Sequence, residues 1–172
     1  MTKTLPLKFA LLGLSLLCSG CVGYRLGGNK PAHLSGITRL AVPTFENLTL
    51  EPRLGSVVTN AIIKQIQADG SYQIVSLDQA EAVLEGKVAG VDRSQFRSDR
   101  NNVLRTSQLL MRLKTSFIIR DSASGSTLHT GQASASTYTV LDTNVQNSEA
   151  QALEDAAQRL AASVAAEISE GW

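Results

Sequence analysis

The clearest pattern in the chain is an alternation of apolar and polar residues over residues 107–120. Leu109, Met111, Leu113, Phe117 and Ile119 alternate with Gln108, Arg112, Lys114, Ser116 and Arg120. A period of two predicts a strand with one buried face and one face at least partly in water. Leu110 and Ile118 are the apolar exceptions on the polar face. The turn-forming residues 121–126 and the Thr- and Ser-rich run 127–140 complete a predicted hairpin with a polar outer surface.

Two other segments carry the apolar stripe of an amphipathic helix. In the first, residues 52–69, apolar residues recur at helical spacing, and we expect Thr49 as the N-cap and Gly70 as the stop. The second begins at Ser148, where Ser148 and Gln151 have the spacing of a capping box. Its stripe continues through residues 153–168, as expected of a helix packed on a core.

Shorter apolar runs predict the remaining strands. They cover residues 37–42, 72–75 and 82–96, with bends at Gly86 and Gly90 in the last. The predicted fold is α+β, a two-layer sandwich in which a mixed, mostly antiparallel sheet of about four strands carries two helices on one face. The first strand-helix-strand step should be parallel and right-handed. Residues 72–75 would form a fifth strand or an edge piece.

The N-terminus has the parts of a secretory signal. Lys3 and Lys8 precede an apolar run over residues 9–18, which is much shorter than the ~20 residues that cross a membrane as a helix. Ser19-Gly20-Cys21 resembles the bacterial lipobox, with Cys18 where Leu is usual. We therefore expect a signal peptide over 1–20, a lipidated Cys21 with a linker over 21–36, and one domain over 37–172.

Lipidation implies attachment to a membrane surface, because two acyl chains supply the two signals that stable anchoring needs. Val22 stands where an Asp would favour retention at the inner membrane, so we expect the cell outer membrane, with the domain facing the periplasm. The mature chain keeps 14 basic residues against 15 acidic ones. This balance gives no indication of a nucleic-acid partner.

The sequence holds no recognisable catalytic, metal or cofactor motif. Its two histidines, His33 and His129, lie far apart, and no nucleophile elbow or phosphate loop occurs. Cys18 and Cys21 have the spacing of a redox or metal motif, but that pair lies in the signal and would be split by processing. We therefore predict no enzyme activity, no cofactor and no metal.

A basic stretch is the one candidate binding feature. It comprises Arg93, Arg97, Arg100, Arg105, Arg112 and Lys114, accompanied by only two acidic residues over 92–114. Such a surface could bind phosphates, for which the planar guanidinium is well suited. The alternative is a solvated sheet face whose charges discourage aggregation.

Three strings are similar to those of the lipopolysaccharide-assembly lipoprotein family. They are Cys-Val-Gly-Tyr-Arg-Leu-Gly from residue 21, the segments at 35–47 and 51–52, and Ala-Glu-Ala-Val-Leu-Glu-Gly at 80–86. The resemblance implies a four-stranded sheet with two helices on one face. It also implies a non-enzymatic role as plug and assembly partner of the lipopolysaccharide-assembly outer-membrane β-barrel protein, with lipopolysaccharide as ligand of the basic stretch. The alternative is a structural subunit of another secretion or Tol-type envelope system without a lipid ligand.

Overall fold

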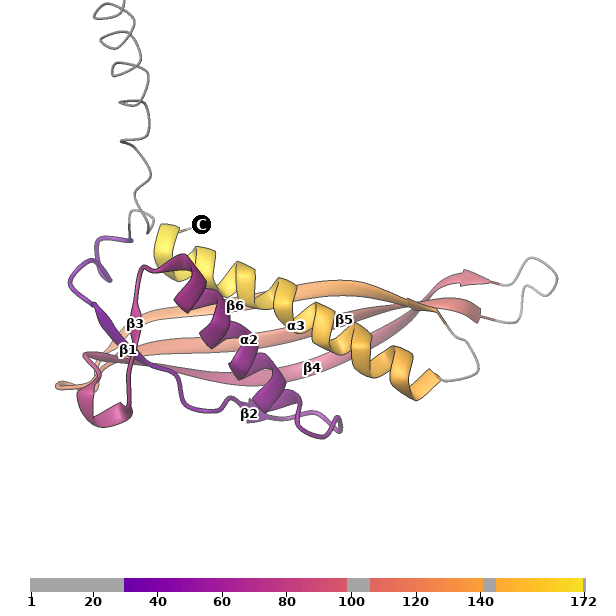
Figure 1. The fold of residues 1–172 in the computed structure, drawn as a ribbon, viewed down its shortest axis with the longest axis horizontal. Coiled ribbons are helices and arrows are strands. Elements are labelled where there is room, and N and C mark those ends of the chain that lie inside the picture. Colours follow the sequence, from indigo (N-terminus) through magenta and orange to yellow (C-terminus); the bar gives the residue numbers. More distant parts are fainter. Residues whose placement is uncertain (1–29, 99–105, 141–144, 172) are drawn as a thin grey trace, which may run out of the picture.

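Two helices lie across one face of a long twisted sheet (Figure 1). The computed structural model describes residues 30–98, 106–140 and 145–171. The predicted signal peptide, Cys21, Arg100 and Arg105 lie outside these residues. The opposite face of the sheet carries no helix among the described elements.

The sheet has six strands in the order β3-β1-β4-β5-β6, with β2 paired to β4 beside this path. They are β1 Arg39–Ala41, β2 Glu46–Asn47, β3 Gln73–Ile74, β4 Ala82–Ser98, β5 Thr106–Asp121 and β6 Thr127–Val140. The predicted fold class is confirmed, but the count of about four strands is too low. β3 lies within the predicted run 72–75 and is the expected edge piece. β2 was not predicted, because its two residues are too short for an alternating pattern to appear in the sequence.

Parallel and antiparallel pairings occupy separate parts of the sheet. β1 runs parallel to β3 and also to β4, as predicted for the first strand-helix-strand step. β2 continues the same edge farther along β4, where Glu46 is opposite Lys87. β4, β5 and β6 form an antiparallel meander. Beyond Val88 these three long strands extend past the parallel part as a narrow arm (Figure 1).

The first helix, α2, spans Leu54–Asp69 and ends as predicted at Gly70. Gly70 has a positive φ of 75° and donates its N–H to the carbonyl of Ile66 at 3.1 Å, the left-handed arrangement that glycine adopts without strain. The prediction of Thr49 as N-cap is wrong. Arg53 holds the cap position with φ 63° and no side-chain cap. Thr49 lies in the preceding loop, where its hydroxyl accepts the N–H of Glu51 at 3.2 Å.

The second helix, α3, spans Val145–Glu170, so it begins three residues before the predicted cap at Ser148. The capping-box prediction is therefore wrong, because Ser148 lies inside the first turns. The predicted stripe is confirmed: Ala156, Leu160, Val164 and Ile168 are fully buried. Burial of this stripe fixes α3 against both α2 and β6.

Phe45 fixes the short parallel edge of the sheet. It is 2 % exposed, and a Cβ added to Gly86 would lie 2.0 Å from its ring. Glycine at position 86 therefore makes room for an aromatic ring on β4. The backbone irregularity that the sequence suggested falls at Gly90, where the β4–β5 register shifts after Val88.

The described end of the predicted linker packs against the domain. Leu34 is fully buried in the core, and the Lys30 ammonium lies 4.0 Å from the centre of the Tyr72 ring while donating to the Ile37 carbonyl at 2.6 Å. The Tyr72 hydroxyl in turn donates to the carbonyl of Ile168 near the end of α3. Ordered packing thus begins upstream of residue 37, at the end of the molecule opposite the arm.

Candidate functional site

The uncovered face of the β4–β6 meander carries part of the predicted basic stretch. On β5, Met111, Leu113 and Phe117 are buried under the helices, whereas Arg112 and Lys114 are exposed on the opposite face. The Arg112 Nε donates to the Ser136 hydroxyl of β6 at 3.2 Å. The Lys114 ammonium lies 2.5 Å from the Asp92 carboxylate of β4. Both cations therefore lie at the surface, each held by one neighbouring strand.

Arg93 lies on the other face. It is opposite buried Met111 and forms ion pairs with Glu51, before α2, and with Glu149, in the first turns of α3. Partial burial acts to lower the pKa of Arg93, but the hydrogen bond to Glu51 and the charge of Glu149 outweigh it and raise the pKa. Arg93 thus ties the two helix beginnings to the sheet and is separated from Arg112 and Lys114.

Arg97 belongs with the exposed cations at the end of the arm. It is opposite Gln108, which alternates along β5 with Leu110 and Arg112 and so shares their face. Its guanidinium carbon lies 6.0 Å from the centre of the Phe96 ring. The predicted stretch is therefore divided: the described residues Arg97, Arg112 and Lys114 share one face, and Arg93 lies on the opposite one.

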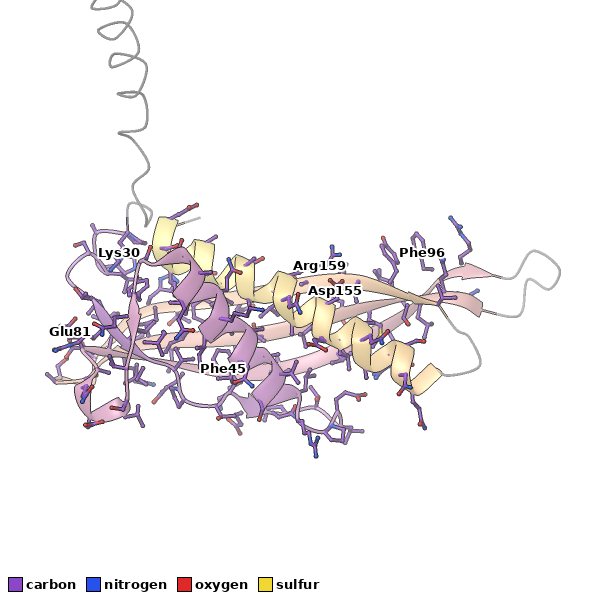
Figure 2. All side chains as sticks on the ribbon, in the orientation of Figure 1. Lys30, Phe45, Glu81, Phe96, Asp155 and Arg159 are labelled. Atoms are coloured by element: carbon purple, nitrogen blue, oxygen red, sulfur yellow. The ribbon has the colours of Figure 1, made fainter. Side chains whose placement is uncertain are left out.

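Apolar side chains accompany these cations on the same face. Phe96, Tyr138 and Val140 are 49 %, 57 % and 55 % exposed, and the Phe96 and Tyr138 rings meet at 4.3 Å. Figure 2 shows Phe96 near the end of the arm, far from Lys30. We call Phe96, Arg97, Leu110, Arg112, Lys114, Tyr138 and Val140 the distal patch. It combines exposed rings with cations, which is unusual for a purely solvated surface.

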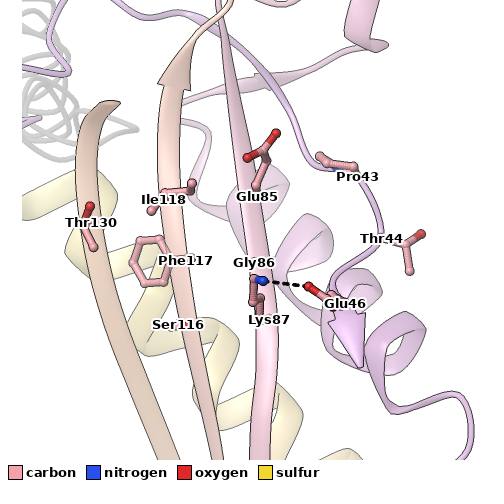
Figure 3. A pocket seen from close by; sticks show the side chains of 10 residues that line it. All are labelled: Pro43, Thr44, Glu46, Glu85, Gly86, Lys87, Ser116, Phe117, Ile118 and Thr130. Atoms are coloured by element: carbon pink, nitrogen blue, oxygen red, sulfur yellow. Dashed lines mark ion pairs between the residues drawn. The ribbon is translucent and has the colours of Figure 1, made fainter. Parts of the chain in front are cut away.

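A hollow of about 420 Å³ lies at the other end of the uncovered face (Figure 3). It is lined by Pro43, Thr44 and Glu46 around β2, by Glu85, Gly86 and Lys87 of β4, by Ser116, Phe117 and Ile118 of β5, and by Thr130 of β6. Lys87 and Glu46 form an ion pair of 2.9 Å at its rim. The hollow offers a mostly apolar floor with charges at the margin, and its lining contains no cysteine or histidine.

The two histidines meet in the folded chain although 96 residues separate them. His33 Nε2 lies 3.3 Å from His129 Nδ1, and His129 Nε2 lies 2.9 Å from a Glu167 oxygen. This row connects the N-terminal segment, β6 and α3 by hydrogen bonds. Among the described residues no group of three His, Cys, Asp or Glu side chains is arranged to hold a metal ion. No described helix is long and apolar enough to span a membrane.

Comparison with known proteins identifies the family. The family model for LptE, described as lipopolysaccharide-assembly, matches residues 37–168. The chain belongs to the LptE family. No curated protein matches it. The LptE-family chain is accordingly a lipoprotein of the bacterial envelope that functions in lipopolysaccharide assembly.

Solved structures share the fold at low sequence identity. The PelC dodecamer from Paraburkholderia phytofirmans is 16 % identical with a TM-score of 0.53, covering 83 % of this chain and 94 % of its own. A putative neuraminyllactose-binding hemagglutinin homolog from Helicobacter pylori is 11 % identical, with a TM-score of 0.55 and coverages of 87 % and 91 %. Uncharacterized lipoprotein B from Nitrosomonas europaea is 13 % identical, with a TM-score of 0.50, and the match covers 84 % of this chain and 92 % of that protein. These similarities establish the fold alone.

For this LptE-family chain, sequence reasoning missed the apolar half of the distal patch. Phe96 and Tyr138 lie on β4 and β6, with β5 between them, so their contact depends on register. One signal was available: Leu110 interrupts the polar face of β5, and it lies between Ser94 and Tyr138 in the sheet. The hollow beside β2 had no such signal, since its wall is a two-residue strand.

Proposed function

We propose that this LptE-family lipoprotein is anchored in the outer membrane through Cys21 and serves as plug and assembly partner of the lipopolysaccharide-transport β-barrel protein. In this role it helps deliver lipopolysaccharide to the cell surface. The family supports the assembly role. The distal patch supports direct contact with the lipid, because its cations and exposed rings complement the phosphates and acyl chains of lipid A.

The observation that carries the lipid-binding proposal is the shared face of Arg97, Arg112, Lys114 and the Phe96–Tyr138 pair. An isolated row of surface cations would serve equally well for solubility. Exposed aromatic side chains between them add an apolar contact that solubility does not require. Arg93 is left out of the proposed site because it lies on the helix-covered face of the sheet, where it pairs with Glu51 and Glu149. Arg100 and Arg105, which lie outside the described residues, remain candidates from the sequence.

Charge reversal on the distal patch tests this proposal. We expect Arg112→Glu with Lys114→Glu to weaken lipopolysaccharide binding by about tenfold or more, equivalent to about 1.4 kcal/mol. The loss should be larger at low salt, because screening acts over roughly 10 Å at 0.1 M. Arg53→Glu with Lys64→Glu, at two exposed positions outside the patch, is the control with the same charge change and should leave binding unchanged. The readouts are titration with purified lipopolysaccharide and far-UV circular dichroism for folding.

Three outcomes would contradict parts of this proposal. Unchanged lipopolysaccharide binding in the double variant would reduce the patch to a solvated surface. Loss of barrel co-purification with lipid binding retained would assign the patch to the protein interface. Recovery of a ring-forming export channel, in place of an assembly barrel, from native membranes would favour the alternative of another secretion or Tol-type system.

A further inference from the structure

The segment between β2 and α2 exposes two leucines at the margin of the molecule. Leu48 is 57 % exposed and Leu50 is 101 % exposed, so the fold leaves Leu50 fully in water. Figure 1 shows this segment as a loop at the edge of the molecule, beyond β2. Two exposed leucines so close together leave apolar surface in water that the fold itself does not cover, and covering it with a partner is favourable.

Hydrogen bonds hold this loop in one shape. The Asn47 Oδ1 accepts hydrogen bonds from the N–H of Thr49 at 3.1 Å and from its hydroxyl at 2.7 Å. The Asn47 Nδ2 donates to the carbonyl of Glu51 at 2.7 Å. The N–H of Leu48 donates to the carbonyl of Val88 on β4 at 3.1 Å. Turning the leucines inward would break these bonds, so the loop presents them in a fixed position.

An apolar groove of about 400 Å³ adjoins the loop, between the beginnings of α2 and α3. Leu54, Val57 and Leu153 are among its apolar residues, and Glu51, Glu149 and Glu154 supply carboxylates. Arg93 balances one of these three negative charges, since it pairs with both Glu51 and Glu149. The groove therefore combines apolar walls with a net negative charge.

We propose that residues 48–50 and this groove, together the leucine site, bind a segment of the barrel protein that presents an apolar side chain next to Lys or Arg. The inference rests on the proposed function and names a surface through which the plug contacts the barrel. The apolar side chain of the partner covers Leu48 and Leu50, and its cation lies against the carboxylates of the groove.

Charge selects this occupant among those that cover apolar surface. Lipopolysaccharide and anionic membrane lipids carry phosphates, which the carboxylates of the leucine site repel. A second copy joined by two-fold symmetry would bring the carboxylates of both copies together. The groove lies between the helices, and the distal patch lies on the opposite face of the sheet. Lipid at the patch and a barrel segment at the leucine site can therefore be bound together, as a plug that delivers lipid requires.

Co-purification of the barrel with the full-length, membrane-anchored chain tests the inference. Leu50→Asp puts a charge where the apolar side chain of the partner lies, and Glu154→Lys reverses an exposed charge of the groove. Together they should lower the barrel recovered per molecule of lipoprotein by about tenfold or more. The matched control is Leu77→Asp with Asp78→Lys on η2 (Leu77–Gln79), at two exposed positions outside the site, and it should leave recovery unchanged.

Photo-crosslinking in cells identifies what lies against the loop. A benzophenone amino acid replaces Leu50, whose full exposure makes the replacement compatible with the fold. We expect ultraviolet light to join the chain to the barrel protein. An adduct with lipopolysaccharide or with a second copy, or no adduct in membranes from which the barrel co-purifies, would overturn the inference.

The lipid readout separates this inference from the proposed function. Leu50→Asp with Glu154→Lys should bind purified lipopolysaccharide as the wild type does and keep its circular dichroism, because both residues lie outside the distal patch. Barrel recovery equal to that of the wild type in this double variant would overturn the leucine site and leave lipid binding at the patch intact. Failure of the wild-type chain to recover any barrel would reject the proposed plug role, and the leucine site with it.

Discussion

At the scale of single residues, the two faces of β5 decide how substitutions act. Leu113 is fully buried, and its neighbour Lys114 is exposed on the opposite face. We expect Leu113→Asp to lower the free energy of unfolding by about 3–5 kcal/mol, because an unpaired charge would enter the core. Lys114→Asp loses only a surface ion pair and should cost about 1 kcal/mol or less. Urea unfolding of both variants measures the difference, and equal effects would contradict the assignment of faces.

Glu81 predicts a pH dependence at the same scale. Its carboxylate accepts hydrogen bonds from the N–H groups of Thr38 at 2.7 Å and Arg39 at 3.0 Å. Both hydrogen bonds lower the pKa of Glu81, and the one from Thr38 has the larger effect. A pKa lowered by folding stabilises the fold above the unfolded-state value of about 4.3, and this stabilisation is lost as pH falls. We therefore expect wild type to be more stable than Glu81→Gln at pH 7, with the gap closing toward pH 3. A gap that is constant with pH in parallel urea titrations would contradict this assignment.

At the scale of elements, the beginning of α2 has a left-handed backbone conformation at a residue that is not glycine. Arg53 is the only described non-glycine residue with positive φ, at 63°, and it provides no side-chain cap. Because glycine adopts this region without the Cβ penalty, Arg53→Gly should raise the free energy of unfolding by about 0.5–1 kcal/mol. Arg53→Ala removes the same side chain and keeps the Cβ, so it should show no gain. Chemical unfolding of the two variants separates backbone strain from loss of the charge.

At the scale of the whole molecule, the folded domain has two distinct ends. The N-terminal segment, through Leu34 and Lys30, is docked at one end, and the distal patch lies at the other. An anchor upstream of Lys30 would therefore attach to the end opposite the patch. We expect mass spectrometry of protein purified from membranes to find residues 1–20 removed and Cys21 acylated. A chain that retains Lys3 and Lys8, or an unmodified Cys21, would rule out the lipoprotein anchor.

Periodicity in the sequence determined the elements that bury one face. The alternation around Leu113 predicted β5, and the stripe from Leu153 to Ile168 predicted most of α3, because burial of one face imposes a period on the residues themselves. The end of α2 at Gly70 was also predicted from the sequence, since glycine is favoured where a helix ends in a left-handed conformation. The capping predictions at Thr49 and Ser148 were wrong, because side-chain capping motifs are short and also occur inside loops and helices.

Only the tertiary structure decided which residues of the basic stretch act together. Proximity along the chain grouped Arg93 with Arg112 and Lys114, but strand alternation and register place Arg93 on the helix-covered face. The same register brings Phe96 to Tyr138 across an intervening strand, and the return of α3 brings Glu167 to His129. Local patterns follow from each segment's own burial. Contacts between distant segments depend on strand order and register, which no single segment encodes.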